Sequence, residues 1–285
     1  MGEIVAATAL SHAPGLTGWL DRATQETQRA LTEGYREIGR LLRAARPDVI
    51  IGIANDHLLN FPPSNVPDFC VGTAARWSGP AEWFRDWLNV APYELPGHPD
   101  LAHALVREGA RAGVNFAFAT DLLFDDNWSV PLAFLTPAHD VPLVPIHMNC
   151  VVPPLPAPAR CIEVGRVIGE IVRRHRPPGE RVAIMATGGL SHDPGGPKYF
   201  AVDAAFDRWF LDLLGQGSSE RVLREVTLER MAAAGDGGTT ELLAWLVALG
   251  AVGDRPARTV CYEPAAALRC GMGAVVWPTE AAARG

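Results

Sequence analysis

Three histidines in this sequence follow short apolar segments and stand among residues that end a strand. They are His12 after residues 4–10, His57 after residues 49–53 and His192 after residues 181–186. An imidazole binds first-row transition metals and exchanges protons near neutral pH. A lone loop histidine is more often an ordinary hydrogen-bonding residue. Three in the same local setting favour a metal-binding or acid–base site.

A carboxylate could complete such a site. Glu241 stands in the first turn of a helix predicted to begin near Thr239 or Thr240, where the helix dipole alone would also favour a carboxylate. Two histidines and one carboxylate form the ligand triad of non-haem iron(II) oxygenases, which leaves coordination positions open for the reactants. The same ligand types with one water form a catalytic zinc site. The residue types alone therefore leave an iron oxygenase and a zinc hydrolase open.

The elements around the first two histidines predict that these residues lie together. Residues 4–10 and 49–53 are apolar runs typical of buried strands, and residues 21–46 between them have helical spacing. A strand–helix–strand unit favours parallel pairing with a right-handed crossover. Neighbouring parallel strands would place His12 and His57 at the same edge of the sheet, where α/β proteins bind their ligands.

Strands and helices continue along the chain and predict one α/β domain over residues 1–285, with a mixed, largely parallel sheet flanked by helices. The other predicted strands are 116–119, 141–148, 181–186, 259–262 and 271–277, and the other predicted helices are 98–111, 160–174, 203–214, 220–231 and one that starts near residue 239. Residues 58–99 lack clear periodicity and predict a binding loop or lid. Trp77, Trp83 and Trp87 would either wall a pocket or pack beneath this loop.

The segment before His192 is rich in glycine. Gly188 and Gly189 permit positive φ angles and a close approach of the backbone to a ligand. They lack the GxGxxG spacing of a dinucleotide site, and no second glycine follows Ser191 as in a nucleophile elbow. The motif therefore predicts neither a Rossmann cofactor site nor a serine hydrolase.

Composition restricts the partners of the protein. A formal net charge of -7 without a dense basic patch argues against nucleic acid. No apolar run is long enough to span a membrane. The five cysteines are odd in number and have no CxxC spacing, which is typical of reduced thiols. We therefore expect a cytoplasmic protein that binds neither nucleic acid nor membrane.

Four motifs in order resemble those of the class III extradiol ring-cleavage dioxygenases, and the catalytic subunit of protocatechuate 4,5-dioxygenase is the member that we find most similar. The motifs are Ser11-His12-Ala13-Pro14, Asn55-Asp56-His57, Gly188-Gly189-Leu190-Ser191-His192 and Thr240-Glu241-Leu242-Leu243-Ala244-Trp245. The likeness covers nearly the whole chain. Each motif alone is weak, but the four together are specific to this family.

The resemblance implies an enzyme that opens a catechol-type ring with Fe(II) and O₂. It implies that His12, His57 and Glu241 bind the iron and that His192 is the acid–base group. We further expect Asn149, Ser191 and Tyr262 to contact the aromatic substrate. A homo-oligomer is expected, and any small lid subunit would be a separate chain.

One residue departs from the family pattern. The family carries a histidine in an Asp-His-Gly motif, and here Asp125-Asp126-Asn127 stands in its place. Asp126 therefore occupies a catalytic position with different chemistry, because a carboxylate donates a proton near neutral pH only if burial or a like charge raises its pKa. This difference makes a 2-aminophenol an alternative substrate. A metal-binding homologue without ring-cleavage activity is a further alternative.

Overall fold

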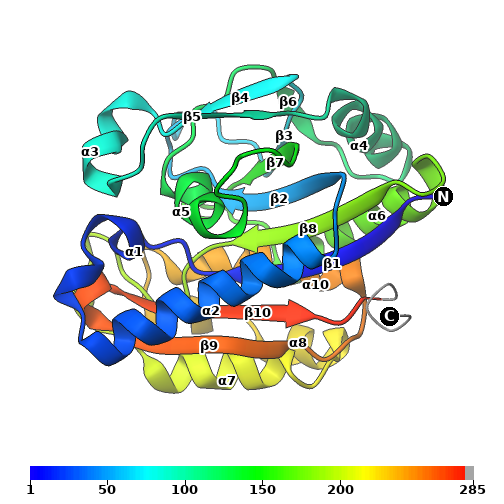
Figure 1. The fold of residues 1–285 in the computed structure, drawn as a ribbon. Helices are drawn as coiled ribbons and strands as arrows, with labels where there is room; N and C mark the ends of the chain where they lie inside the picture. The colour runs from blue at the N-terminus through cyan, green and yellow to red at the C-terminus, as the bar shows by residue number, and fades with distance from the viewer. Residues whose placement is uncertain (280–285) are drawn as a thin grey trace.

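A mixed eight-stranded sheet runs through the middle of the protein in the computed structural model, which describes residues 1–279 (Figure 1). Its strands lie in the order β6-β3-β7-β2-β8-β1-β10-β9. The bounds are β1 (Glu3–Leu10), β2 (Val49–Asn55), β3 (Phe69–Gly72), β6 (Ala117–Ala119), β7 (Leu143–Met148), β8 (Arg181–Thr187), β9 (Arg258–Ala265) and β10 (Cys270–Trp277). The central strands β7, β2, β8 and β1 are parallel, whereas β10 is antiparallel to β1 and β3 to β7.

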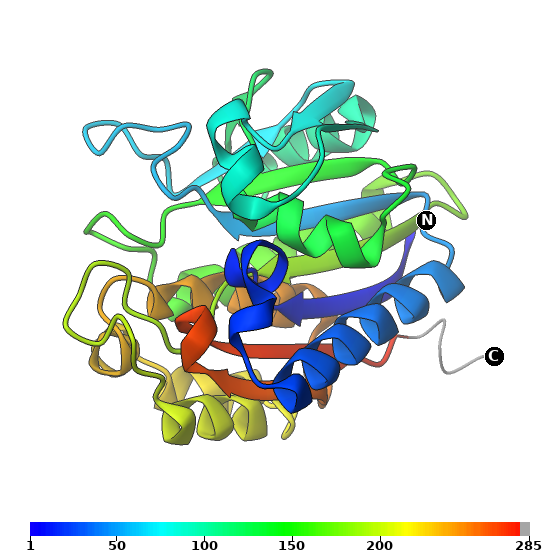
Figure 2. The same ribbon diagram turned by 60° about the vertical axis from the view of Figure 1, so that its left-hand side comes forward.

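Helices cover both faces of this sheet (Figures 1 and 2). One face packs against α2 (Gln25–Ala44) and α5 (Asp126–Leu135). The other face packs against α6 (Pro158–His175) and α10 (Leu242–Val252), with α4 (Pro99–Arg111) beside α6 and α7 (Ala204–Leu214) beside β10. Apolar cores therefore lie on both sides of the sheet, and this explains why every residue of β2 is buried.

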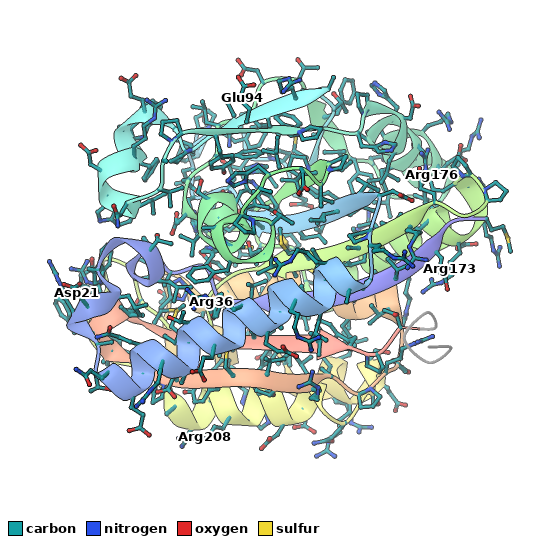
Figure 3. The ribbon with its side chains drawn as sticks, viewed as in Figure 1. Asp21, Arg36, Glu94, Arg173, Arg176 and Arg208 are labelled. Atoms are coloured by element: carbon teal, nitrogen blue, oxygen red, sulfur yellow. The ribbon has the colours of Figure 1, made fainter. Side chains whose placement is uncertain are left out.

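Many charged side chains lie on the outside of the protein. Asp21, Glu94 and Arg208 are exposed and point away from the body of the protein (Figure 3). The helix α10 shows the opposite pattern, since all of its residues are buried. A helix that is apolar on every side must lie inside the fold, and α10 packs between α6 and the sheet. No helix within residues 1–279 is long and apolar enough to cross a membrane, and the five cysteines are unpaired.

The predicted pairing of the first two strands is wrong in one respect. We expected β1 and β2 to be neighbours, but β8 lies between them and is parallel to both. The first 57 residues carry no signal for the strand that later fills this gap. The carboxyl ends of all three parallel strands still meet at one edge.

The structure also revises several local predictions. Residues 58–99 contain the sheet strand β3, a separate hairpin of β4 (Arg76–Gly79) and β5 (Tyr93–Pro96), and the short helix α3 (Arg85–Leu88). We missed β3 because it is only four residues long. The predicted helix 220–231 is two helices, α8 (Ser219–Glu225) and α9 (Leu228–Ala234), because Val226 between them is extended.

Candidate metal centre and active site

His57 is delivered by a strained turn at the end of β2. Its φ angle is 43° and that of Leu58 is 59°, a left-handed conformation that costs a non-glycine residue about 1 kcal/mol or more. The carboxylate of Asp56 accepts hydrogen bonds from the backbone N–H groups of Asn60 and Phe61 at 3.1 and 3.0 Å and holds the turn. Such strain, maintained by neighbouring bonds, is typical of functional sites.

His12 follows β1 and is buried with 3% of its surface exposed. Its Nδ1 lies 3.0 Å from Thr187 Oγ1, and the hydroxyl of Thr187 donates to the carbonyl of Asn127 at 2.9 Å. Because this hydroxyl has one proton, which goes to Asn127, it accepts from His12. The proton of a neutral His12 is therefore on Nδ1, and its Nε2 is bare.

Glu241 is the point on which the histidines converge. It ends a short 3₁₀ turn, Thr239–Glu241, and is 2% exposed. Its two carboxylate oxygens lie 2.8 Å from His57 Nε2 and 3.3 Å from His12 Nε2. The amide of Asn55 and the backbone N–H of Gly189 also donate to it, at 3.1 and 2.8 Å. Burial alone would raise the pKa of Glu241, but the surrounding histidines hold it well below its usual value.

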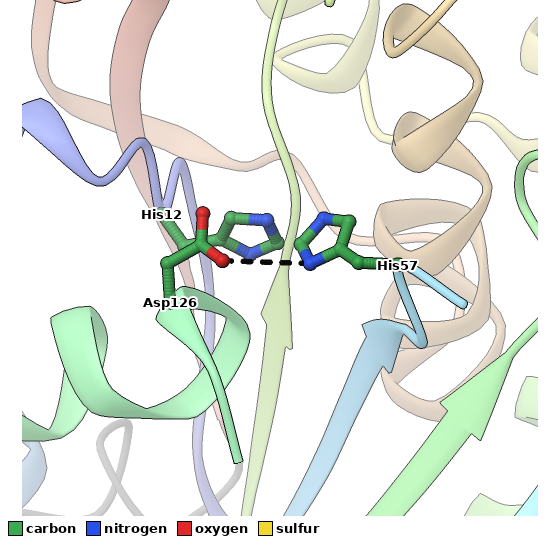
Figure 4. Close-up of side chains that lie close together, drawn as sticks. All are labelled: His12, His57 and Asp126. Atoms are coloured by element: carbon green, nitrogen blue, oxygen red, sulfur yellow. Dashed lines mark ion pairs between the residues drawn. The ribbon is translucent and has the colours of Figure 1, made fainter. Parts of the chain in front are cut away.

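Two further carboxylates, those of Asp125 and Asp126, lie beside the Nδ1 atom of His57. Asp125 caps α5 by accepting from Asn127 N, and its Oδ2 lies 3.1 Å from His57 Nδ1. Asp126 Oδ1 lies 3.5 Å from the same nitrogen (Figure 4). Burial works against the charge on His57, but Asp125, Asp126 and Glu241 together raise the pKa of His57 well above its usual value. Burial raises the pKa of Asp126 to about 6.

These groups fit a divalent metal ion. In the protein without metal, His57 Nε2–H donates a hydrogen bond to Glu241. A metal ion bound to both residues would take the place of this proton. Asp125 and Thr187 hold the remaining nitrogens of the two histidines, as hydrogen-bond partners of metal-bound histidines do. Three buried carboxylates in one pocket also need a compensating positive charge.

Two carboxylates compete for the role of third ligand. Each of His12, His57 and Asp126 offers one potential ligand atom, and these three atoms lie within 4.8 Å of one another. Asp126, however, is nearest to His57 Nδ1, which already faces Asp125. Glu241 lies beside the Nε2 atoms of both histidines. The contacts therefore favour Glu241 as ligand and leave Asp126 beside it, facing the pocket.

His192 lies next to this cluster, and its Nδ1 is paired with a backbone carbonyl instead of a side chain. Its Nδ1 donates to the carbonyl of Leu190 at 2.9 Å, and its Nε2 lies 3.6 Å from Glu241. Burial opposes its charge, but Glu241 raises the pKa of His192. A Cβ at Gly189 or Gly238 would lie 2.4 or 2.3 Å from this ring. These glycines therefore permit close packing against the His192 ring, while the predicted approach of the backbone at Gly188 and Gly189 to a ligand stays a prediction. Neither glycine has the positive φ that we also considered.

A cavity of about 370 Å³ opens onto the cluster. The three histidines and Glu241 form its floor with Asp125 and Asp126, and Trp19, Phe84, Trp87 and Tyr199 are among its walls. Of the three tryptophans that we considered, Trp87 thus lines the pocket, Trp77 is buried elsewhere against Phe124, and Trp83 is 64% exposed. The lining thus combines the histidines and carboxylates with aromatic rings, as in pockets that bind a small aromatic ligand.

The structure does not bring Asn149, Ser191 or Tyr262 to this cavity, although we expected them to contact the substrate. Asn149 bonds with Val151 and Val152 of its own loop. The hydroxyls of Ser191 and Tyr262 both donate to the buried carboxylate of Asp207, at 3.0 and 2.9 Å. Conversely, we did not predict roles for Thr187, Asp125 and Arg269. For Thr187, the available signal was its position immediately before Gly188-Gly189.

Known proteins share this fold and this sequence pattern. The crystal structure of an uncharacterized protein from Escherichia coli K12 matches with a TM-score of 0.63 at 19% identity, over 95% of this chain and 99% of that one, which shows a likeness of fold. The 2,3-dihydroxyphenylpropionate/2,3-dihydroxicinnamic acid 1,2-dioxygenases of E. coli strains K12 and O157:H7 are each 32% identical over 222 residues. This match covers 76% of the present chain and 66% of those proteins, slightly less than two thirds of their length. The model of the catalytic LigB subunit of aromatic ring-opening dioxygenases matches residues 6–270, and the chain belongs to this family.

Proposed function

We propose that the protein is an Fe(II)-dependent extradiol dioxygenase. It would break the carbon–carbon bond beside the two hydroxyls of an aromatic diol and place both atoms of O₂ in the ring-opened product. The observation that carries this proposal is the convergence of two histidine Nε2 atoms on buried Glu241, at the floor of an aromatic-walled cavity. Membership of the ring-opening family supports it, and so do relatives named for a diol substrate.

In this proposal His12, His57 and Glu241 hold the iron. Bound Fe(II) would keep coordination positions open, so that the diol and O₂ meet in one orientation. Asp125 and Thr187 would keep the Nδ1 proton on His57 and His12 and leave each Nε2 available as a ligand. Membership of the ring-opening family favours iron, and zinc, which takes the same donor types, is the alternative to be tested.

His192 is proposed to move protons at Nε2. Its Nδ1 donates to the carbonyl of Leu190 and its Nε2 lies 3.6 Å from Glu241, so Nε2 is the nitrogen that, in neutral His192, would take a proton from a substrate hydroxyl. The same atom can return the proton to an oxygen of the opened ring. Such general acid–base catalysis contributes about a hundred- to ten-thousand-fold to a rate. Gly189 and Gly238 leave no space for a larger residue beside the ring.

The ligand assignment is tested by loading the protein with Fe(II) in the absence of air. Wild type should bind about one iron per chain, and Glu241→Gln should lose tight binding because it removes the carboxylate between the two histidines. Asp126→Asn should retain iron and serves as the matched control. Loss of iron from Asp126→Asn, with retention in Glu241→Gln, would reassign the ligand. Full turnover in zinc-loaded, iron-free protein would favour a hydrolase.

The role of His192 is tested by His192→Gln. This variant should keep the wild-type iron content and bind a catechol, while oxygen uptake falls about a hundred-fold or more because the proton carrier is absent. Reduced iron with normal turnover per iron would show that His192 is a ligand instead. A wild type that binds iron and catechols but consumes no oxygen would support a homologue without ring-cleavage activity.

Asp126 favours a second candidate substrate, a 2-aminophenol. Its carboxylate lines the cavity beside the proposed ligands, where an amino donor on the ring would gain a charge-assisted hydrogen bond. A carboxylate attached directly to the ring would meet like charge there. We expect weak activity on protocatechuate and a gain relative to catechol in Asp126→Asn or Asp126→His. Unchanged preferences in both variants would remove Asp126 from substrate selection.

We also propose that the chain forms a homo-oligomer, and a separate small lid subunit over the cavity is the possibility that the resemblance raises. Trp87 lines the cavity and is 45% exposed, and the nearby Trp83 is 64% exposed. Size-exclusion chromatography of the chain, alone and with candidate small subunits, tests both.

A further inference from the structure

We propose that Arg269 forms an anion-binding subsite in the cavity, which takes a carboxylate carried by the substrate on a side chain of its ring. This inference rests on the proposed function and narrows the substrate to an aromatic diol with an acidic side chain. The residues that carry it, Arg269, Tyr199 and Trp19, line the same cavity as the proposed ligand residues.

Arg269 is the only lysine or arginine among the residues that line the cavity. The acidic lining residues Asp125, Asp126 and Glu241 are all engaged with histidines. Within residues 1–279 the side chain of Arg269 forms no ion pair, and its only hydrogen bond is to the hydroxyl of Tyr199. A guanidinium has five N–H donors, so most of its donors remain available to a ligand.

Aromatic rings hold the guanidinium without neutralising it. Its Cζ lies 4.6 Å from the ring centroid of Tyr199, 5.4 Å from that of Trp19 and 5.5 Å from that of Phe200. Cation–π contacts stabilise the charge through the ring faces and leave the planar N–H edges for a carboxylate. An arginine that served only to stabilise the fold would more commonly be paired with an acidic residue.

The parts of this subsite are fixed in place before any ligand binds. The indole N–H of Trp19 donates to the carbonyl of Ala267 at 3.2 Å and ties α1 (Gly15–Gly18) to the turn before Arg269. The loop of Tyr199 is held by the buried carboxylate of Asp193, which accepts from Lys198 N and Gly237 N at 2.9 and 3.0 Å. Arg269 itself has a left-handed φ of 63°. This conformation costs energy and persists because the turn is anchored.

The distribution of charge sets the orientation of a bound substrate. The three carboxylates of the cavity belong to the metal centre, and a carboxylate beside the diol would be placed against Asp126. An acidic group on a side chain can instead reach Arg269 and form paired N–H···O bonds. The diol end of the ring then faces the histidines, and the acidic end faces the arginine.

The test compares an acid with its neutral ester. Fe(II)-loaded wild type, Arg269→Gln and Arg269→Lys are assayed for oxygen uptake with 3-(2,3-dihydroxyphenyl)propionate and with its methyl ester. Arg269→Gln should raise KM for the acid by about 10- to 100-fold, the usual value of a charged hydrogen bond, and leave the KM for the ester within about two-fold. Arg269→Lys keeps the positive charge but loses the paired N–H donors of the guanidinium, so its KM for the acid should lie between those of wild type and Arg269→Gln.

Arg22→Gln is the matched control, because Arg22 also lies over Trp19, with Cζ 6.0 Å from the ring centroid, but does not line the cavity. It should leave both values of KM unchanged. The subsite proposal would be overturned if Arg269→Gln raised the KM for the acid and for the ester equally. It would also be overturned if Arg22→Gln raised the KM for the acid as much as Arg269→Gln does. Iron content and circular dichroism of each variant show whether the metal centre and the fold are retained.

A binding measurement separates this inference from the proposed function. Metal-free protein is titrated with 3-phenylpropionate and with 3-phenylpropanamide, which lack the diol, and the fluorescence of Trp19 and Trp87 in the cavity wall reports binding. Wild type should bind the acid more tightly than the amide, and Arg269→Gln should abolish this preference. If that holds while no diol is cleaved, the subsite stands and the dioxygenase proposal fails. If diols are cleaved without any preference for the acid, the subsite fails alone.

Discussion

At the scale of single residues, the hydrogen bond made by Nδ1 decides the tautomer of His12 and of His57. Thr187 accepts from His12 because its own proton is given to Asn127, and Asp125 accepts from His57. Both bonds direct Nε2 toward Glu241. The histidines and the glutamate could be predicted from residue type and motif, but their partners could not, since a hydroxyl or carboxylate that supports a ligand has no pattern of its own.

Thr187→Val should weaken metal binding without unfolding the protein. Valine keeps the shape of threonine but removes the acceptor for His12 Nδ1–H, so the ring loses its fixed orientation and the buried N–H loses its partner. We expect Fe(II) affinity to fall about 10- to 100-fold, as measured by titration without air. The control is Thr8→Val, which removes a buried bond to the Val275 carbonyl away from the site. Equal iron affinity in both variants would contradict the role of Thr187.

Substrate contacts were the least predictable residues. Ser191 and Tyr262 stand beside or within predicted functional segments, yet their hydroxyls point to Asp207. A motif indicates which loop reaches the site but not which of its side chains turn inward. Here that depends on Asp207 of α7, which accepts from both hydroxyls and lies 16 residues from Ser191 and 55 from Tyr262.

At the scale of elements, the strand ends place the site and the helix α10 fixes its carboxylate. Apolar periodicity predicted β1, β2, β7, β8 and most helices to within a few residues, because buried strands and amphipathic helices have clear patterns. It missed α5, whose hydrophobic positions are buried all round and which contains Pro131. The close contact of α6 with α10 could not be predicted either, since it depends on glycines that meet across the interface.

Gly165→Ala should therefore affect both stability and the site. A Cβ at Gly165 in α6 would lie 2.0 Å from the carbonyl oxygen of Val247, so α10 would have to move. We expect unfolding free energy to fall by about 1–3 kcal/mol. Iron affinity should also fall, because Glu241 immediately precedes α10. Gly215→Ala is the control, since its Cβ would lie no closer than 3.3 Å from any neighbour. Chemical denaturation and iron titration that showed no difference between the two variants would exclude this coupling.

At the scale of the whole molecule, the layered α/β architecture follows from the sequence but the order of strands does not. Alternating strand and helix segments require a sheet covered on both faces. The position of β8 between β1 and β2 depends on pairings between residues more than a hundred positions apart. This placement brings the His192 segment to the same edge as His12 and His57, and it joins α7 to the site through the bonds of Asp207.

Asp207 predicts how the stability of the whole fold depends on pH. It is completely buried on α7, accepts hydrogen bonds from Ser191 and Tyr262, and has a pKa that burial raises to about 6. A carboxyl whose pKa is higher in the folded than in the unfolded state binds its proton more tightly when folded. Its contribution to unfolding free energy is therefore complete below about pH 4 and is lost as the pH rises through about 6.

Asp207→Asn cannot titrate and should remove this dependence. Between about pH 4 and pH 7, metal-free wild type should lose about 2–3 kcal/mol of unfolding free energy relative to the variant, because each pKa unit corresponds to about 1.4 kcal/mol. Urea denaturation at intervals of half a pH unit measures the difference, and Asp21→Asn, which removes one exposed charge, is the control. Parallel curves for wild type and Asp207→Asn would mean that Asp207 keeps one protonation state throughout. The tie between α7 and the His192 segment would then depend on its hydrogen bonds alone and would not vary with pH.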